Sequence, residues 1–203
     1  MLMLATVGEW VREAVAAGGY PAVALLILIE NVFPPIPSEV ILPLAGYYVG
    51  QGELAFVPAV AAATVGSVAG ALVLYALARR GGRPLLLRHG RVLRLAEADL
   101  DRGDAWFDRH GAWLVFFGRL VPGVRSLVSV PAGLSEMPLG RFVWLTAAGS
   151  ALWNAALIGA GWALGSNWEQ VGSYVGPLST AVVALLAAGA AAWFVRRRRR
   201  RTA

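Results

Sequence analysis

The sequence predicts an all-α integral membrane protein built as an inverted repeat. A re-entrant helical hairpin and a transmembrane helix occur twice, with an extra C-terminal transmembrane helix and a cytoplasmic amphipathic connector. Residues 54–78, 142–168 and 170–195 carry no formal charge, and each stretch exceeds the roughly 20 residues that cross a hydrocarbon core. With 58% apolar and only 15% charged residues, three such stretches are a poor match to buried helices of a soluble protein. We expect a single membrane domain over residues 1–203.

The repeat is read from two proline-rich segments, residues 30–43 and 119–131, which are distorted copies of each other. One offset along the chain aligns two prolines, a serine and a valine in each copy: Pro34, Ser38, Val40 and Pro43 with Pro122, Ser126, Val128 and Pro131. The first copy carries carboxylates and the second carries guanidiniums. Charge in a broken helix at membrane depth is typical of a substrate path.

The first half is expected to contain a re-entrant hairpin over residues 14–50 and a span over residues 54–78. The uncharged pieces 14–29 and 40–52 are too short to be spans, and 10–14 residues is typical of re-entrant or core segments. Between these two pieces stand Pro34, Pro35 and Pro37, which forbid a continuous helix because proline has no N–H and clashes with the preceding turn.

The polar, arginine-rich residues 79–110 are expected to form a cytoplasmic amphipathic connector. Leu100, Gly103 and Phe107 recur at helical spacing, with Trp106 and Trp113 close by, which is typical of a helix on a membrane surface. A plain cytoplasmic helix is the alternative.

The second half is expected to contain a re-entrant hairpin over residues 111–137 and a span over residues 139–165. The hairpin is broken at Pro122 and Gly123. A further span is expected over residues 177–195. Six consecutive arginines then lie within the tail 196–203, and a juxtamembrane basic stop explains them better than nucleic-acid binding.

The charge distribution orients the chain. A cytoplasmic tail places the arginine-rich connector inside and the net-negative segments outside, in agreement with the positive-inside rule. The first hairpin then enters from outside and the second from inside. Irregular backbone at depth is tolerated only inside protein or beside a watery cavity, so the two hairpin tips are expected to meet near the midplane.

Arg119 and Arg125 are the expected binding residues for a substrate phosphate. Guanidinium groups match phosphate oxygens in bidentate geometry, and the break at Pro122 and Gly123 lets both side chains point at one spot. The competing interpretation is a structural ion pair of either arginine with Glu30 or Glu39 that closes the two hairpins together; both interpretations can hold.

Glu30 and Glu39 are the expected proton-coupling residues, because burial favours the protonated form of a carboxylate. For Glu39 the alternative is structural: Ser38 caps a helix and Glu39 favours the helix dipole. The chain has no cysteine, which excludes thiolate metal sites, and no metal, cofactor or catalytic residue is expected.

Several segments resemble the DedA family of bacterial membrane proteins, which is related to the VTT-domain lipid scramblases. The segments are residues 105–111, 117–125 and 131–133 with Met137 and Phe142, and upstream Glu30, Asn31 and residues 37–39. The resemblance implies a protein of the bacterial inner membrane, which agrees with the multi-pass topology and the cytoplasmic C-terminus expected from the charges. It also implies proton-coupled translocation of undecaprenyl phosphate, with the family's essential arginines at Arg119 and Arg125 and its membrane acids at Glu30 and Glu39.

The expected function is therefore a membrane lipid transporter, with protons, a lipid phosphate and membrane lipids as partners and no nucleic acid. One alternative is a flippase or scramblase of another phospholipid. Another is a proton-driven small-ion or drug exporter, but an exporter would leave the two arginines unexplained. A membrane phosphatase would need a nucleophile and an acid or base near those arginines, but the candidate nucleophiles Ser126 and Ser129 have no evident base. A non-transporting scaffold is also compatible with the sequence. Glycine pairs on the spans allow helix packing within one chain or in a homo-oligomer.

Overall fold

The computed structural model describes residues 2–33, 38–82 and 97–167, together with residues 170, 181 and 184. Within these ranges the regular secondary structure is entirely helical, in agreement with the all-α class that the sequence predicts. Three expected features lie outside the described residues: the prolines Pro34, Pro35 and Pro37, the span over residues 177–195 apart from 181 and 184, and the basic tail 196–203. The middle of the connector, residues 83–96, also lies outside them.

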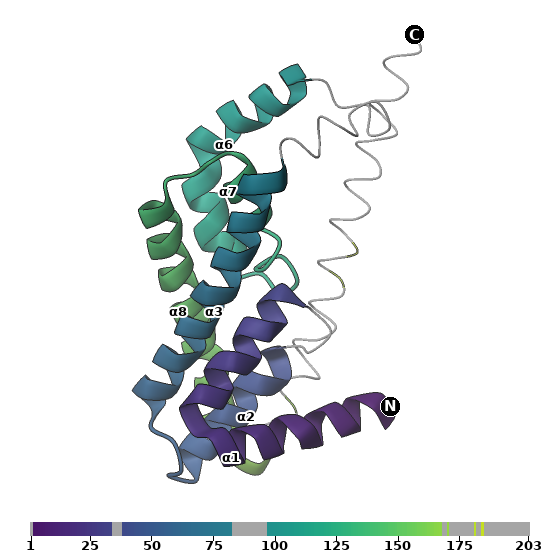
Figure 1. Ribbon diagram of the computed structural model, residues 1–203. Coiled ribbons are helices and arrows are strands. Elements are labelled where there is room, and N and C mark those ends of the chain that lie inside the picture. The colour runs from purple at the N-terminus through teal and green to yellow at the C-terminus, as the bar shows by residue number, and fades with distance from the viewer. Residues whose placement is uncertain are drawn as a thin grey trace.

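The first half consists of α1 (Leu2–Val32), α2 (Ser38–Gly50) and α3 (Phe56–Leu77), which continues as the π-helical turn η1 (Ala78–Gly82). Helix α1 is bent at Gly19, whose φ of 53° is readily adopted only by glycine. Pro21 follows in the first turn after the bend, where a missing N–H costs no hydrogen bond. In Figure 1 the N-terminal part of α1 points away from the bundle, and only its part after Gly19 runs along α3.

The second half consists of α6 (Glu97–Gly118), α7 (Ser129–Leu134) and α8 (Leu139–Leu164), which ends in the 3-10 turn η2 (Gly165–Asn167). Helix α6 runs without interruption through position 110, so the helix expected in the connector and the first arm of the second hairpin are one element. Residues 119–128 form turns between α6 and α7, and Gly123 within them has a φ of 74°. Pro122 and Gly123 thus stand where the helical chain is interrupted.

Three helical segments are long and apolar enough to cross a membrane: Glu13–Val32, Phe56–Gly82 and Leu139–Asn167. The last two are the spans expected over residues 54–78 and 139–165. The first includes the bend at Gly19, so that its straight part after the bend is only about 20 Å long at 1.5 Å per residue. That length is short of a ~30 Å hydrocarbon core.

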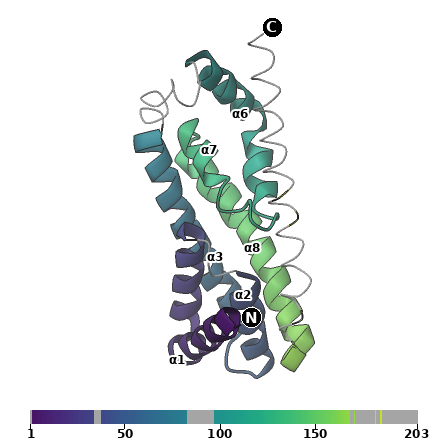
Figure 2. The same cartoon turned by 90° about the vertical axis from the view of Figure 1, so that its right-hand side faces the viewer.

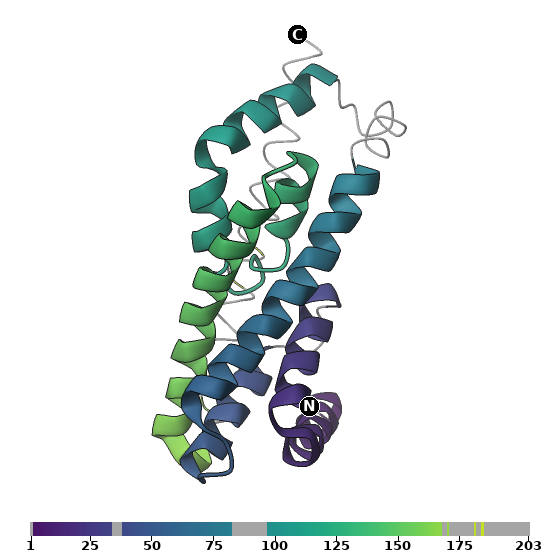
Figure 3. The ribbon, with the colours of Figure 1, turned by 60° about the vertical axis from the view of Figure 1, so that its left-hand side comes forward.

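The hairpins of the two halves lie at opposite ends of the pair of long helices, α3 and α8. Figures 1 to 3 show α1 and α2 along one end of the α3–α8 pair and α6 and α7 along the other end. The Tyr20 hydroxyl accepts a hydrogen bond from the Ala55 N–H at 2.8 Å, which ties the start of the first hairpin to the beginning of α3. The end of the second hairpin lies beside the other end of α3, where Gly133 packs against Tyr75 and Ala78.

The packing repeats between the halves in detail. Gly70 on α3 lies against the Leu28 carbonyl and Asn31 of α1, and Gly149 on α8 lies against the Phe116 carbonyl and Arg119 of α6. Leu28 and Asn31 precede Phe116 and Arg119 by the same offset that aligns the two proline-rich segments. The first arm of each hairpin therefore contacts a glycine on the long helix of its own half through residues that are equivalent in the repeat.

The second arm of each hairpin packs on the long helix of the other half. Helix α2 meets α8 through Gly46 and Gly161, where an added Cβ would stand 2.0 Å from the Ile158 carbonyl and 2.1 Å from the Pro43 carbonyl. Helix α7, the second arm of the second hairpin, likewise contacts α3, the long helix of the first half. Gly165 has no such contact within the described chain and instead ends α8 with a φ of 53°.

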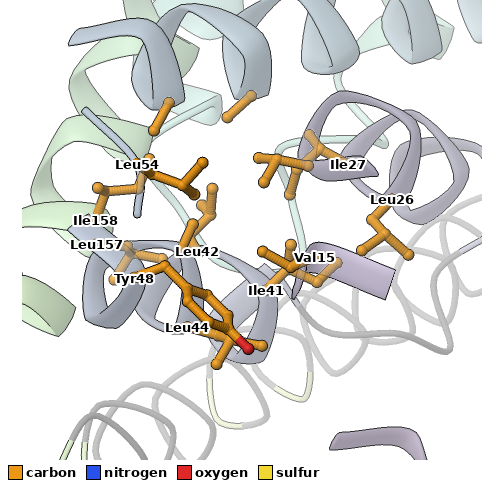
Figure 4. Packing of buried hydrophobic residues seen from close by; sticks show 14 residues of the cluster. Val15, Leu26, Ile27, Ile41, Leu42, Leu44, Tyr48, Leu54, Leu157 and Ile158 are labelled. Carbon is orange, nitrogen blue, oxygen red and sulfur yellow. The ribbon is translucent and has the colours of Figure 1, made fainter. Parts of the chain in front are cut away.

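The main apolar core fills the end of the bundle that holds the first hairpin. Figure 4 shows residues of α1, α2 and α8 pointing toward one another, among them Ile27, Leu42 and Ile158, which are fully buried. A second cluster around Phe142 lies at the other end, where the Phe142 ring stacks on Tyr75 with centroids 4.6 Å apart. Each core fixes one hairpin against the long helices, and the polar site lies between them.

Candidate functional site

The two hairpins bring four buried charged residues into the interior. Glu30 and Glu39 are 7% and 8% exposed, and Arg119 and Arg125 are 1% and 5% exposed. Asn31, next to Glu30, packs on Gly70, which lies near the middle of the span Phe56–Gly82. The site is therefore at mid-depth of the long helices, where an ionised group without a partner would be costly.

Arg125 and Glu30 form an ion pair that joins the two halves. Arg125 Nη2 donates to Glu30 Oε2, and both side chains are almost completely enclosed. The sequence suggested an ion pair between the hairpins, of Arg119 or Arg125 with Glu30 or Glu39. The structure contains the pair of Arg125 with Glu30. Removing one partner of such a pair leaves an uncompensated buried charge, which typically costs 3–5 kcal/mol, about a third of the stability of many domains.

Asn31 joins the groups of the site through its side-chain amide. Its Oδ1 accepts from Arg119 Nη1 at 3.4 Å and from Ser126 Oγ at 3.3 Å, and its Nδ2 donates to the Ile27 carbonyl at 2.9 Å and to Glu30 Oε2 at 3.5 Å. One amide thereby contacts the carboxylate of one hairpin and the guanidinium of the other. An amide supplies a donor and an acceptor at once, which no carboxylate or ammonium can do.

Arg119 is held by neutral acceptors only among the residues that the structure describes. Besides Asn31 it donates from Nη2 to Ser129 Oγ at 2.7 Å, while its Nε has no acceptor in the described part of the chain. A buried donor without an acceptor costs about 1–3 kcal/mol. Arg119 thus retains unused capacity to bind an anion.

Glu39 stands near the start of α2, and its carboxylate has no hydrogen-bond or ion-pair partner within the described residues. It is close enough for its charge to act on Glu30. Ser38, 1% exposed, begins the same helix. If both carboxylates and both guanidiniums are ionised, the four charges cancel, and protonation of one carboxylate leaves one positive charge unmatched.

The structure brings together Glu30, Arg119 and Arg125, with Glu39 nearby, while their expected roles in phosphate binding and proton coupling stay predictions. Sequence reasoning gave no role to Asn31 and treated Ser126 and Ser129 only as candidate nucleophiles without a base. Two signals could have found Asn31 and Ser126, whereas no such signal points to Ser129. Ser126 aligns with Ser38 across the repeat, and Asn31 aligns with Arg119.

Within the described residues no group of three or more His, Cys, Asp or Glu side chains is placed to hold a metal ion. His110 lies away from the arginines at the exposed surface of α6, where its ring stacks on Trp106 and its Nδ1 is 3.1 Å from the Trp106 carbonyl. Two buried guanidiniums beside a carboxylate are the groups that this arrangement offers, and guanidiniums can bind an anion in bidentate geometry.

Comparison with known proteins identifies a family and several relatives. Residues 36–163 match the VTT domain family. A Lactococcus lactis protein named alkaline phosphatase-like protein is 46% identical over 83% of this chain and 81% of its own length. Proteins named undecaprenyl phosphate transporter A are 35% identical in Bacillus subtilis, over 82% of both chains, and in Staphylococcus aureus, over 79% of this chain and 81% of the relative. No solved structure shows a significant match.

Proposed function

This chain belongs to the VTT domain family, in agreement with the DedA resemblance of its sequence, and on that premise we propose that it transports a lipid phosphate, undecaprenyl phosphate, across the membrane. The observation that carries the proposal is the pair of buried guanidiniums, Arg119 and Arg125, at the meeting point of the two hairpins. The names of the two 35%-identical relatives support this substrate class.

Arg125 exchanges its partner during transport. In the arrangement described here the carboxylate of Glu30 occupies the guanidinium of Arg125. A phosphate monoester also presents two oxygens to one guanidinium and, as a dianion, carries one more negative charge than a carboxylate. It can therefore replace Glu30 and also accept from the Nε of Arg119, which has no acceptor among the described residues. The isoprenoid tail stays in the lipid while the phosphate passes between the hairpins.

The charge balance of the site couples phosphate to protons. The four buried charges are neutral when both acids are ionised, so an entering phosphate adds negative charge that must be matched. Protonation of Glu30 and Glu39 leaves two guanidiniums, which balance a phosphate dianion. Protons taken up with the lipid on one side and released on the other would then drive transport along the proton gradient.

The opposed packing of the two hairpins supports an alternating mechanism with both hairpins re-entrant. Helix α2, helix α7 and the part of α1 after Gly19 are each shorter than a membrane crossing. Each hairpin packs on long helices of both halves, so a relative movement of the halves would open the site first to one face and then to the other. We place the protein in the bacterial inner membrane, with the end of α3 that carries Arg79 and Arg80 toward the cytoplasm, as the positive-inside rule requires.

The test uses liposomes that contain purified protein and undecaprenyl phosphate, with an impermeant reagent to detect exposed phosphate. We expect exposure that accelerates under an inward proton gradient and is lost in Arg125→Gln. The matched control is Arg141→Gln, since Arg141 is an exposed arginine of α8 outside the site. Equal exposure in wild-type and protein-free liposomes would overturn the proposal.

A membrane phosphatase is the second candidate, because the name of the 46%-identical relative points to it. Such an enzyme would transfer the phosphoryl group to a nucleophile, and the hydroxyls nearest the guanidiniums are Ser126 and Ser129, which donate to Asn31 and accept from Arg119. Release of inorganic phosphate in the same liposomes, lost in Ser129→Ala, would favour the phosphatase over the transporter.

A further inference from the structure

Two further arginines, Arg79 and Arg80, line a cavity at the end of the α3 span, apart from the central site. The cavity of about 540 Å³ is lined by Tyr75, Arg79, Arg80, Glu136 and Leu139, with two aliphatic residues of α3. Arg79 and Arg80 lie in the last residues of the span Phe56–Gly82, and Leu139 is the first residue of the span Leu139–Asn167. The cavity therefore lies where both long helices leave the hydrocarbon core, which is the depth of lipid headgroups.

The walls of this cavity combine positive charge with apolar surface. Arg79 donates to the Tyr75 hydroxyl at 3.0 Å, and the hydroxyl in turn donates to the Met137 carbonyl. Tyr75 is buried and stacked on Phe142, so it holds the guanidinium of Arg79 at a fixed place. Leu139 is half exposed, and Leu77, on the same helix as the arginines, is 64% exposed. A cationic wall beside exposed apolar side chains suits an amphiphile with an anionic head.

Two local distortions lie at the same cavity. Arg79 and Arg80 belong to the π-helical turn η1, a rare conformation that occurs often at functional sites. Glu136 has a φ of 48°, which is unfavourable for a residue with a side chain. Its carboxylate lies 3.9 Å from Arg79, with the two side chains 66% and 45% exposed. This pair is solvated and weak, so an incoming anion can displace the carboxylate at low cost.

Helix α7 connects the cavity to the central site. Ser129 at its start accepts from Arg119, while Gly133 near its end packs on Tyr75 and the Arg79 backbone. The six residues of α7 span only about 9 Å at 1.5 Å per residue. A headgroup bound at Arg79 is thus close to the buried guanidiniums and separated from them by one short helix.

We propose that this cavity is a headgroup site in which Arg79 and Arg80 bind the phosphate monoester of an isoprenoid lipid before it reaches the central arginines. The proposal rests on the proposed function for its substrate class, and it assigns binding residues that the central site does not include. Glu136 acts as the competing anion and lowers the affinity of the empty site.

Binding is measured without transport, by a fluorophore on the single cysteine of a Gly140→Cys variant. The chain has no other cysteine, and a Cβ at Gly140 meets no atom within 4 Å in the described residues. Farnesyl phosphate, farnesol and inorganic phosphate are titrated against the labelled protein in detergent. We expect a saturable signal with farnesyl phosphate, weakened at least tenfold by the double substitution Arg79→Gln, Arg80→Gln and unchanged by Arg141→Gln.

The substitution Glu136→Gln gives the sharper test, because it should strengthen binding of farnesyl phosphate several-fold. A merely structural ion pair would give no change or a weaker signal, and either result would overturn the proposal. An equal response to farnesol would also overturn it, since phosphate would then contribute nothing. A response to inorganic phosphate at similar concentrations would support the phosphate site and identify free phosphate as its source.

Transport separates this inference from the function itself. If the wild type moves undecaprenyl phosphate, the double arginine variant should raise the half-saturating lipid concentration and leave the maximal rate nearly unchanged, whereas Arg125→Gln removes the rate. If the wild type moves no lipid phosphate but farnesyl phosphate binds as expected, the proposed function fails and the headgroup site stands. If the wild type transports undecaprenyl phosphate but farnesyl phosphate does not bind at the labelled cavity, the proposed function stands and the headgroup site fails.

Discussion

Asn31 and Arg119 occupy equivalent positions in the two halves of the chain, and they are hydrogen-bonded to each other, with Arg119 Nη1 3.4 Å from Asn31 Oδ1. Each packs beside the glycine of its own long helix, Gly70 or Gly149. Equivalent residues of an inverted repeat can touch only where the two halves meet. The polar site therefore stands at the centre of the repeat, where a movement between the halves changes its contacts most directly.

The ion pair between Arg125 and Glu30 should show strong energetic coupling. We expect Arg125→Gln to destabilise the protein by about 3–5 kcal/mol, because it leaves the Glu30 carboxylate buried without its partner. The double variant Glu30→Gln, Arg125→Gln should be markedly more stable than the sum of the single effects predicts, as measured by denaturant unfolding in detergent. Additive effects of the two substitutions would contradict a direct pair.

Asn31→Leu should lower stability by about 1–3 kcal/mol and remove transport, because Arg119 and Ser126 both lose the acceptor Oδ1. The matched control is Asn154→Leu, which removes another buried amide, one that donates to Thr64 on α3 at 3.2 Å and is not hydrogen-bonded to Arg119 or Arg125 among the described residues. Unfolding and liposome transport are measured on both. We expect both variants to lose similar stability and only Asn31→Leu to lose transport. Equal transport by the two variants would contradict a role of Asn31 in the site.

Gly70→Ala and Gly149→Ala should have similar effects, since the glycines stand at equivalent contacts. An added Cβ would lie 2.6 Å from the Asn31 Cβ in one case and 2.8 Å from the Phe116 carbonyl in the other. We expect each to cost about 1–3 kcal/mol in thermal-unfolding experiments. The control Gly159→Ala places its Cβ at 3.9 Å from Phe56 and should be nearly neutral. A neutral Gly149→Ala beside a costly Gly70→Ala would argue against the symmetry.

Glu39→Gln should separate folding from proton coupling. Its carboxylate has no partner in the described part of the chain, so the substitution should leave thermal stability within about 0.5 kcal/mol of wild type or raise it. Because a glutamine mimics a permanently protonated acid, we expect transport that no longer responds to a proton gradient, measured in the liposome assay. A gradient response equal to that of wild type would assign the proton to Glu30 alone.

The membrane class and the helical architecture could be predicted from the sequence because length and lack of charge suffice to identify α3 and α8 as spans. The helix break at Pro122 and Gly123 could also be predicted, because proline and glycine affect the backbone locally. The continuity of α6 through position 110 could not be predicted from the change from polar to apolar sequence. A polar and an apolar stretch can belong to one helix when its two ends face different surroundings.

Charge beside proline in apolar sequence is enough to predict that Glu30, Glu39, Arg119 and Arg125 are buried and charged. Their pairing cannot be predicted in this way and follows from the folded structure. The pairing of Arg125 with Glu30, and of Arg119 with Asn31 and Ser129, depends on how two hairpins far apart in the chain are held by close glycine contacts on α3 and α8. Such contacts depend on ångström-scale packing between helices, which local patterns of hydrophobicity and charge do not encode.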